Sequence, residues 1–181
     1  MKFFRIIHLS DIHIGDTYID SKDIAYRIIS DVENENLSDI RCVIVTGDIF
    51  EGKCGLNENI IKEAVDFFDI IYNELRNSTK IEKTDFLFVP GNHDIMRKKG
   101  TSEQWEKYRS FLQQFYGIVP EFYNPNNLSL IRIYEDSRIA FVGFNSCGLK
   151  EDTVFDTNLY KNIERIEDSQ FGTCGFEKKI Y

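Results

Sequence analysis

Features of secreted and membrane proteins are missing from this sequence. Its four cysteines form no C-x-x-C pair, and four cysteines in a chain of 181 residues do not make a disulfide framework. No apolar run approaches the ~18 residues that a membrane-spanning helix needs. The first nine residues hold two basic residues and a histidine, which is unlike a signal peptide. These absences predict a reduced, cytoplasmic protein that does not cross a membrane.

Positive charge is also scarce, with 22 Lys and Arg residues against 30 Asp and Glu residues and a net charge of −8. Such a chain repels the nucleic-acid backbone on average, which disfavours a general DNA-coating role. The short basic run MRKKG at 96–100 is more simply explained as a solvated loop. The G-x-S-x-G, G-x-x-x-x-G-K-[ST] and G-x-G-x-x-G motifs are absent too, which disfavours the enzyme classes that use them.

Linkers rich in proline or glycine and internal repeats are absent, and the length suits one domain over residues 1–181. What the sequence contains instead is an alternation of apolar runs with amphipathic segments. Strands that alternate with helices favour a parallel sheet of βαβ units, so the expected fold class is α/β. The pattern predicts strands at 3–9, 41–48 and 84–94 (the last with its exit loop), helices at 21–35, 57–77, 101–117 and 157–169, and a hairpin at 128–146.

Polar residues of the same kinds follow each of the three predicted strands. Asp11 and His13 follow the first, Asp48 follows the second, and the sequence GNHD (91–94) follows the third. Because the C-terminal ends of parallel strands share one edge of the sheet, we expect these side chains to meet there. Carboxylate, imidazole and amide ligands without thiolate favour Mn²⁺, Fe, Zn²⁺ or Ni²⁺. Each motif alone is a weak signal, but three in order predict a divalent metal site.

Other residues near these strand ends have simpler structural explanations. His8 lies inside the first apolar run, where a hydrogen-bonded core histidine is expected. Residues 145–147, Asn-Ser-Cys, end the last predicted strand, and a structural turn explains them better than a role in the site. Gly47 and Gly91 are expected to leave room for the backbone to approach a metal or phosphate closely.

Taken together, the three motifs resemble those of the calcineurin-like metallophosphoesterase family. The stretch HLSDIH is similar to the family's cyclic-nucleotide phosphodiesterase and SbcD-like nuclease branches. The resemblance implies an αββα sandwich with a two-metal site, in which metal-activated water hydrolyses a phosphoester, most simply a phosphodiester. It also implies that His93 lies beside the phosphate, where it protonates the leaving oxygen or stabilises the transition state, and that Asp94 orients His93.

By the same resemblance, Asp11 and His13 would bind the first metal, Asp48 would bridge both metals, and Asn92 would bind the second. Complete family members supply further histidine ligands from their second half, but this sequence has no histidine after His93. We therefore expect a domain truncated in its C-terminal part, with a poorly occupied second site and weak or no activity of this chain alone. An uncovered sheet edge would then favour self-association or a partner chain.

Three hypotheses for the function stay open at this point. The leading one is a metal-dependent phosphodiesterase acting on a phosphoester, with a nucleotide or nucleic acid as open alternatives for the substrate. The second is a fragment of an SbcD-like DNA nuclease, against which the net charge of −8 speaks mildly. The third is a degenerate, non-catalytic interaction module. The missing histidines favour this third hypothesis, and the intact motif residues oppose it.

Overall fold

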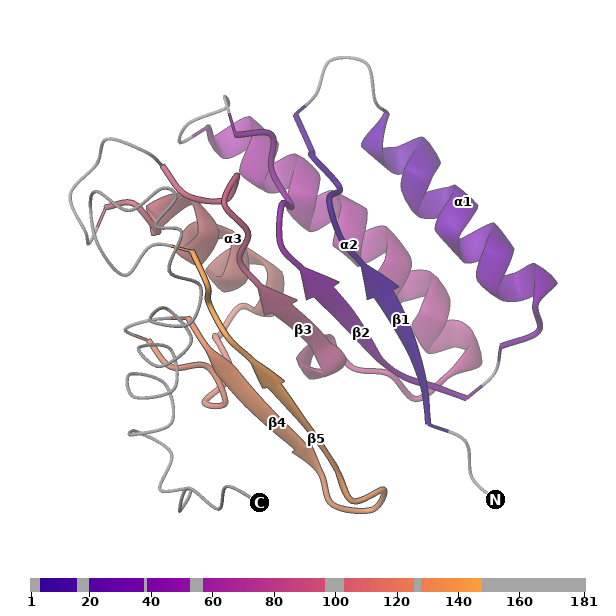
Figure 1. Cartoon of the computed structure of the whole chain (residues 1–181). Coiled ribbons are helices and arrows are strands. Elements are labelled where there is room, and N and C mark those ends of the chain that lie inside the picture. Colours follow the sequence, from indigo (N-terminus) through magenta and orange to yellow (C-terminus); the bar gives the residue numbers. More distant parts are fainter. Residues whose placement is uncertain are drawn as a thin grey trace.

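The computed structural model describes residues 4–15, 20–37, 39–52, 57–96, 103–125 and 128–147. These residues form a layer of helices, a parallel sheet and a separate antiparallel hairpin (Figure 1). The parallel sheet has the strand order β1-β2-β3. The expected α/β fold class is therefore confirmed. Within the described ranges, no helix combines the length and the apolar character that a bilayer crossing requires.

The elements follow the predicted order, and the strands are shorter than the apolar runs that predicted them. The described strands are β1 (Arg5–Leu9), β2 (Ile40–Thr46), β3 (Phe86–Val89), β4 (Leu130–Tyr134) and β5 (Ile139–Gly143), and the helices are α1 (Ser21–Asn34), α2 (Glu58–Ser78), the 3₁₀ helix η1 (Lys83–Asp85) and α3 (Glu106–Tyr116). The predicted helix at 157–169 lies outside the described residues.

Two helices show how local sequence sets their ends. Asn57 precedes α2 and caps its first turn, because its side chain accepts a hydrogen bond from the amide of Asn59 at 3.0 Å. Gly117 ends α3 with φ of 76°, a left-handed conformation that glycine adopts without strain. At the start of α3, Trp105 stands at the N-cap position and makes no side-chain hydrogen bond there.

The helices cover one face of the parallel sheet with an aromatic core. Val45 and Phe88 lie side by side on this face, and both are fully buried. The ring of Phe88 lies 4.8 Å from that of Phe68, 5.0 Å from Phe111 and 5.2 Å from Phe115, measured between centroids. Edge-to-face contacts of this kind add to the large apolar area that aromatic residues bury. The core therefore fixes α2 and α3 against β3.

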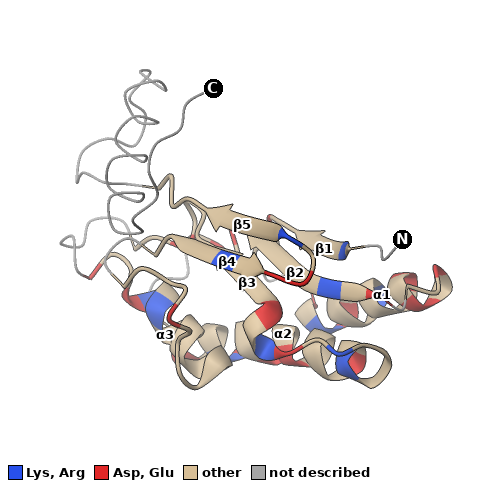
Figure 2. Cartoon of the chain, turned by 90° about the horizontal axis from the view of Figure 1, so that it is seen from below, with Lys and Arg blue, Asp and Glu red and all other residues tan. Residues whose placement is uncertain are grey.

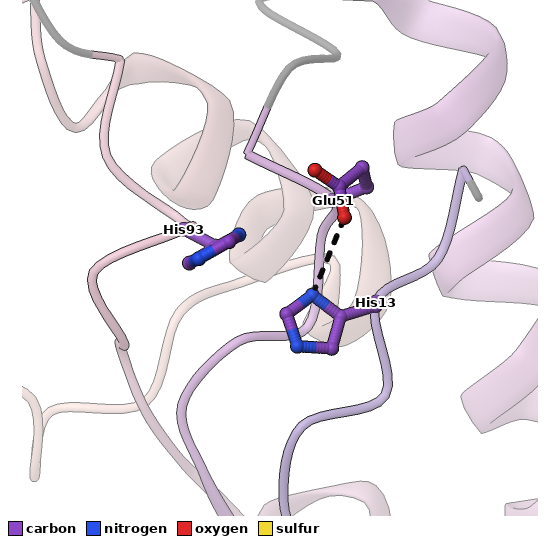
Figure 3. A group of neighbouring side chains, drawn as sticks. All are labelled: His13, Glu51 and His93. Carbon is purple, nitrogen blue, oxygen red and sulfur yellow. Dashed lines mark ion pairs between the residues drawn. The ribbon is translucent and has the colours of Figure 1, made fainter.

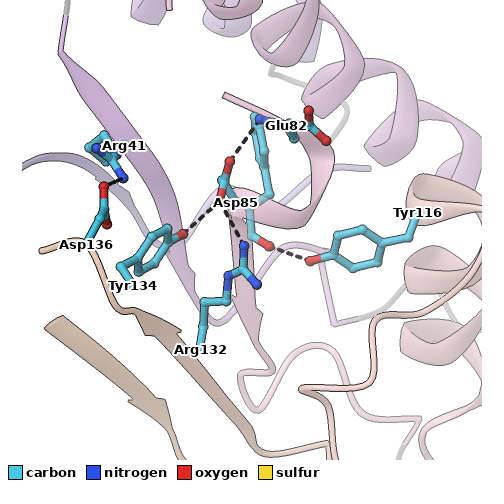
Figure 4. A network of polar contacts seen from close by, with 8 residues as sticks. Arg41, Glu82, Asp85, Tyr116, Arg132, Tyr134 and Asp136 are labelled. Carbon is cyan, nitrogen blue, oxygen red and sulfur yellow. Dashed lines mark hydrogen bonds and ion pairs between the residues drawn. The ribbon is translucent and has the colours of Figure 1, made fainter. Parts of the chain in front are cut away.

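The hairpin β4–β5 lies on the opposite side of the parallel sheet from the helices (Figure 2). Asp85 of η1 holds it, because one carboxylate oxygen accepts hydrogen bonds from the Tyr134 hydroxyl at 3.0 Å and from Arg132 at 3.4 Å (Figure 4). A second link joins Arg41 of β2 to Asp136 in the hairpin turn at 2.7 Å. Together these contacts attach the second sheet to the first.

His8 differs from its expected environment. Its ring forms a hydrogen bond with the Thr46 hydroxyl at 2.7 Å, but the residue is exposed instead of lying in the core. The expectation of burial was wrong because His8 lies on the exposed face of β1, where Ile6 is also 45% exposed.

Candidate metal centre

The segments that follow β1 and β2 continue side by side beyond the two strands. The amide of His13 donates to the carbonyl of Asp48 at 3.0 Å, and that of Ile14 donates to Ile49 at 2.8 Å. The amide of Glu51 then donates back to Ile14 at 2.9 Å. Ile14 and Ile49 are buried, so they anchor this pairing in the core. As a result, the first two motifs are held against each other at the C-terminal edge of the sheet.

Three predicted ligands share an uncommon backbone conformation. The φ angles are 54° for Asp11, 53° for His13 and 52° for Asp48. Left-handed backbone costs non-glycine residues roughly 1–2 kcal/mol each, and such conformations cluster at functional sites. One ligand atom from each of these three residues lies within 4.8 Å of the others. The two strand ends therefore converge as the motif spacing predicted.

The two glycines of the motifs allow the loops after β2 and β3 to touch. A Cβ atom on Gly91 would collide with the backbone amide and carboxylate of Asp48, and one on Gly47 would lie 2.8 Å from the Cα of Gly91. Gly47 also has φ of 84°. The sequence predicted close approach of the backbone to a metal or phosphate. The structure shows that the glycines serve the approach of one loop to the other.

The third motif joins the same cluster. The backbone amide of His93 donates to the Asp48 carboxylate at 2.9 Å, and its ring packs edge-on against that of His13, with centroids 4.9 Å apart. The amide of Gly52 donates to Nδ1 of His93 at 3.2 Å. Since Nδ1 accepts this hydrogen bond, the proton of the neutral ring resides on Nε2. Asn92 is exposed and lines the same pocket as Asp48.

Asp94 is buried beneath the loop that carries His93. Its carboxylate accepts hydrogen bonds from the amides of Phe50 at 3.0 Å and Gly91 at 2.8 Å. Burial raises the pKa of Asp94 to about 6, although these two amides act in the opposite direction. The sequence predicted that Asp94 orients His93. The observed bonds of Asp94 fix the loop backbone, and the amide of Gly52 holds the ring.

The donor set fits a divalent cation. Asp11, His13 and Asp48 supply two carboxylates and an imidazole whose ligand atoms lie within 4.8 Å of one another. A model of the calcineurin-like phosphoesterase family matches residues 4–170. The chain belongs to this family. The protein is accordingly a metal-dependent hydrolase of phosphoesters. A comparison with curated proteins found no match.

Two residues of this phosphoesterase were missed by the sequence analysis. Glu51 forms a second group with His13 and His93, whose ligand atoms also lie within 4.8 Å of one another (Figure 3). Lys107 is 1% exposed, and its ammonium group lies 3.4 Å from the carbonyl of His93 and 4.7 Å from the ring centre of Phe50. Lys107 stands four residues before the buried Phe111, which places both on the same face of α3. This spacing could have predicted that Lys107 is buried. Glu51 lies in a loop, where no periodicity marks it.

A pocket of ≈ 480 Å³ opens beside the centre of the phosphoesterase, between the sheet and the hairpin. Asp48 and Asn92 border it, and so does Cys147. Residues 145–147 form the predicted turn, in which the amide of Cys147 donates to the side chain of Asn145 at 3.0 Å. Burial raises the pKa of the Cys147 thiol to about 11, so the thiol is protonated at neutral pH. The other residues that line the pocket are Ile44, Thr46, Gly47, Leu87, Val89, Pro90, Gly91, Leu130, Phe141, Val142, Gly143, Phe144 and Ser146.

Proposed function

We propose that this phosphoesterase hydrolyses phosphodiesters. The observation that carries the proposal is the charge of the described pocket: none of the residues that line it is Lys or Arg. A phosphomonoester carries a charge of about −1.5 to −2 at pH 7, whereas a diester carries a single charge, so the diester needs less compensation. Phe141 and Val142 in the wall suit an apolar ester substituent.

The residues of the centre have separate roles in this proposal. Asp11, His13 and Asp48 hold divalent metal, with Asn92 as an additional neutral ligand beside Asp48. When bound, divalent cations polarise phosphoryl oxygens and lower the pKa of coordinated water, which supplies a nucleophile near neutral pH. The metal could be Mn²⁺, Fe, Zn²⁺ or Ni²⁺ on the chemistry of these ligands. The left-handed backbone of the three ligands keeps their side chains together before metal binds.

His93 is proposed as the hydrogen-bond donor to the leaving oxygen. As the oxygen of water bonds to phosphorus, the ester P–O bond breaks, and Nε2–H of His93 stabilises the negative charge that develops on the leaving oxygen, which then takes up a proton from water. The hydrogen bond from Gly52 to Nδ1 supports this role, because it keeps the hydrogen of the neutral ring on the opposite nitrogen. Asp94 supports it indirectly, because its bonds to Phe50 and Gly91 hold the loop in place.

The first prediction concerns Asp48→Asn. With Mn²⁺ present, the protein is expected to hydrolyse bis(p-nitrophenyl) phosphate faster than p-nitrophenyl phosphate. The substitution should lower the diester rate by more than about 100-fold, since even residues behind a metal ligand often contribute 10–100-fold. Release of nitrophenolate measures both rates. Asp31→Asn, which makes the same charge change at an exposed position of α1, should leave them unchanged.

A monoester rate equal to or above the diester rate would overturn the proposal. Cleavage of a DNA oligonucleotide that weakens steeply with salt would favour the nuclease hypothesis instead. Metal binding without hydrolysis of any of these substrates would favour the non-catalytic module.

A further inference from the structure

Glu51 presents its carboxylate to the imidazole of His13. One oxygen of Glu51 lies 3.6 Å from Nδ1 of His13, and the two side chains are 24% and 28% exposed (Figure 3). The pairing of the segments after β1 and β2 creates this placement, because the amide of Glu51 donates to the carbonyl of Ile14. The preceding residue, Phe50, is fully buried, so the backbone that carries Glu51 is held in place by the core.

The two nitrogens of His13 have different surroundings. Nδ1 faces Glu51, and it is buried without a hydrogen-bond partner in the described part of the chain. The other nitrogen lies on the side of the ring away from Glu51 (Figure 3). A neutral imidazole has one free lone pair, so only one of the two nitrogens can bind a cation held with Asp11 and Asp48. Because Nδ1 faces a carboxylate, the geometry favours Nε2 for this role.

We propose that Glu51 is a positioning residue that accepts the Nδ1–H of His13 and so keeps Nε2 free to bind the divalent cation. The inference rests on the proposed function only in taking a divalent cation as the ligand. A carboxylate behind a metal-binding histidine fixes its tautomer and ring orientation and makes it a stronger ligand. Contacts in metal-free sites are often long and tighten when the ligand binds, which agrees with the 3.6 Å separation.

The experiment compares Glu51→Gln and Glu51→Ala with the wild type by calorimetric titration with Mn²⁺. Glu51→Ala is expected to weaken Mn²⁺ binding by about 10–100-fold, the usual effect of removing such a partner. Glu51→Gln should fall between the alanine variant and the wild type, because its amide oxygen still accepts the Nδ1–H without the charge. Glu33→Gln, at an exposed position of α1, is the matched control and should bind Mn²⁺ as the wild type does.

A second measurement reads the tautomer directly, in the metal-free chain. Long-range ¹⁵N–¹H spectra should show the neutral His13 ring protonated on Nδ1 in the wild type and as a mixture of tautomers in Glu51→Ala. An unchanged tautomer together with weaker Mn²⁺ binding would make Glu51 a direct ligand and overturn the proposal, and so would unchanged Mn²⁺ affinity. Neither measurement uses a substrate, so failure to hydrolyse diesters would leave this inference standing.

Discussion

At the scale of single residues, backbone amides hold the reactive side chains of this centre. The amide of Gly52 donates to His93 Nδ1 at 3.2 Å, and the amides of Phe50 and Gly91 donate to Asp94. A backbone donor has a fixed direction once its loop is fixed. The orientation of the His93 ring thus depends on how closely the loop at Gly52 lies against it.

Gly52→Ala is the prediction that tests this dependence. The added Cβ would lie 2.8 Å from Nδ1 and 3.2 Å from Cγ of His93, so the ring must move. Because removing one hydrogen-bond donor to a developing charge costs about 10²–10³-fold in kcat, we expect kcat for the diester to fall by at least about 10-fold. Thermal unfolding should change little, since the clash is with a side chain that can rotate. Steady-state kinetics and a melting curve measure the two effects.

Gly117→Ala is the control with the opposite expectation. Nothing lies within 4 Å of the added Cβ, but φ of 76° strains an alanine. This variant should lose about 1 kcal/mol of stability and keep its kcat. If Gly52→Ala kept full activity, the amide of Gly52 would have no part in holding His93.

The predictability of the centre also differs from residue to residue. Asp11, His13 and Asp48 could be located because strand ends in a parallel sheet meet at one edge. The role of Asp94 in orienting His93 stays a prediction, and its bonds to the amides of Phe50 and Gly91 could not be predicted, because every residue except proline has a backbone amide and no sequence motif marks which one donates. Glu51 was missed because the pairing that places it continues past the ends of both strands.

At the scale of elements, the order of helices and strands followed from the sequence, but the buried face of α1 did not. Ile24, Ile28 and Val32 recur at helical spacing and predict an apolar stripe, yet they are only half-buried, while Ala25 and Ile29 are buried. Alanine adds little to an apolar pattern, but its small side chain lets α1 pack closely on its neighbour. The buried face of α1 is therefore shifted by about one residue from the predicted stripe.

Asp85→Ala is the prediction for the attachment of the hairpin. The substitution leaves Tyr134 and Arg132 without their acceptor, where the Asp85 side chain is only 14% exposed. Loss of a buried acceptor costs about 1–3 kcal/mol, so the free energy of unfolding should fall by that amount. Urea denaturation followed by circular dichroism measures it.

Asp136→Ala provides the comparison, because it removes a different link between the parallel sheet and the hairpin, the ion pair with Arg41. Its ion pair with Arg41 lies at the surface, where such pairs contribute little. A loss of stability in Asp136→Ala as large as in Asp85→Ala would contradict the view that η1 is the main attachment point.

At the scale of the whole molecule, one aromatic core joins the helices to the parallel sheet. Phe88→Ala removes a fully buried ring that contacts α2 and α3, so we expect a loss of about 3–5 kcal/mol in the free energy of unfolding. Urea denaturation measures the loss. Tyr26→Ala, at a position 55% exposed on α1, should change stability by less than about 0.5 kcal/mol. Similar losses in both variants would place the stabilising contacts elsewhere.

The layered architecture was predictable in part. Alternating strands and helices gave the parallel sheet and its helical layer, and the turn at residues 135–137 gave the hairpin. The side of the sheet on which the hairpin lies depends on long-range contacts such as those of Asp85, which local patterns do not contain. The truncated αββα sandwich expected from the resemblance stays a prediction.

The unusual φ angles at Asp11, His13 and Asp48 have an evolutionary consequence. Glycine would relieve the backbone strain at each of these positions, and relief of such strain is a common way to raise the stability of a protein. A lineage selected for heat tolerance alone would therefore tend to acquire glycine there and lose the donors one by one. With its present residues, the protein keeps the three donor side chains at a cost in conformational stability.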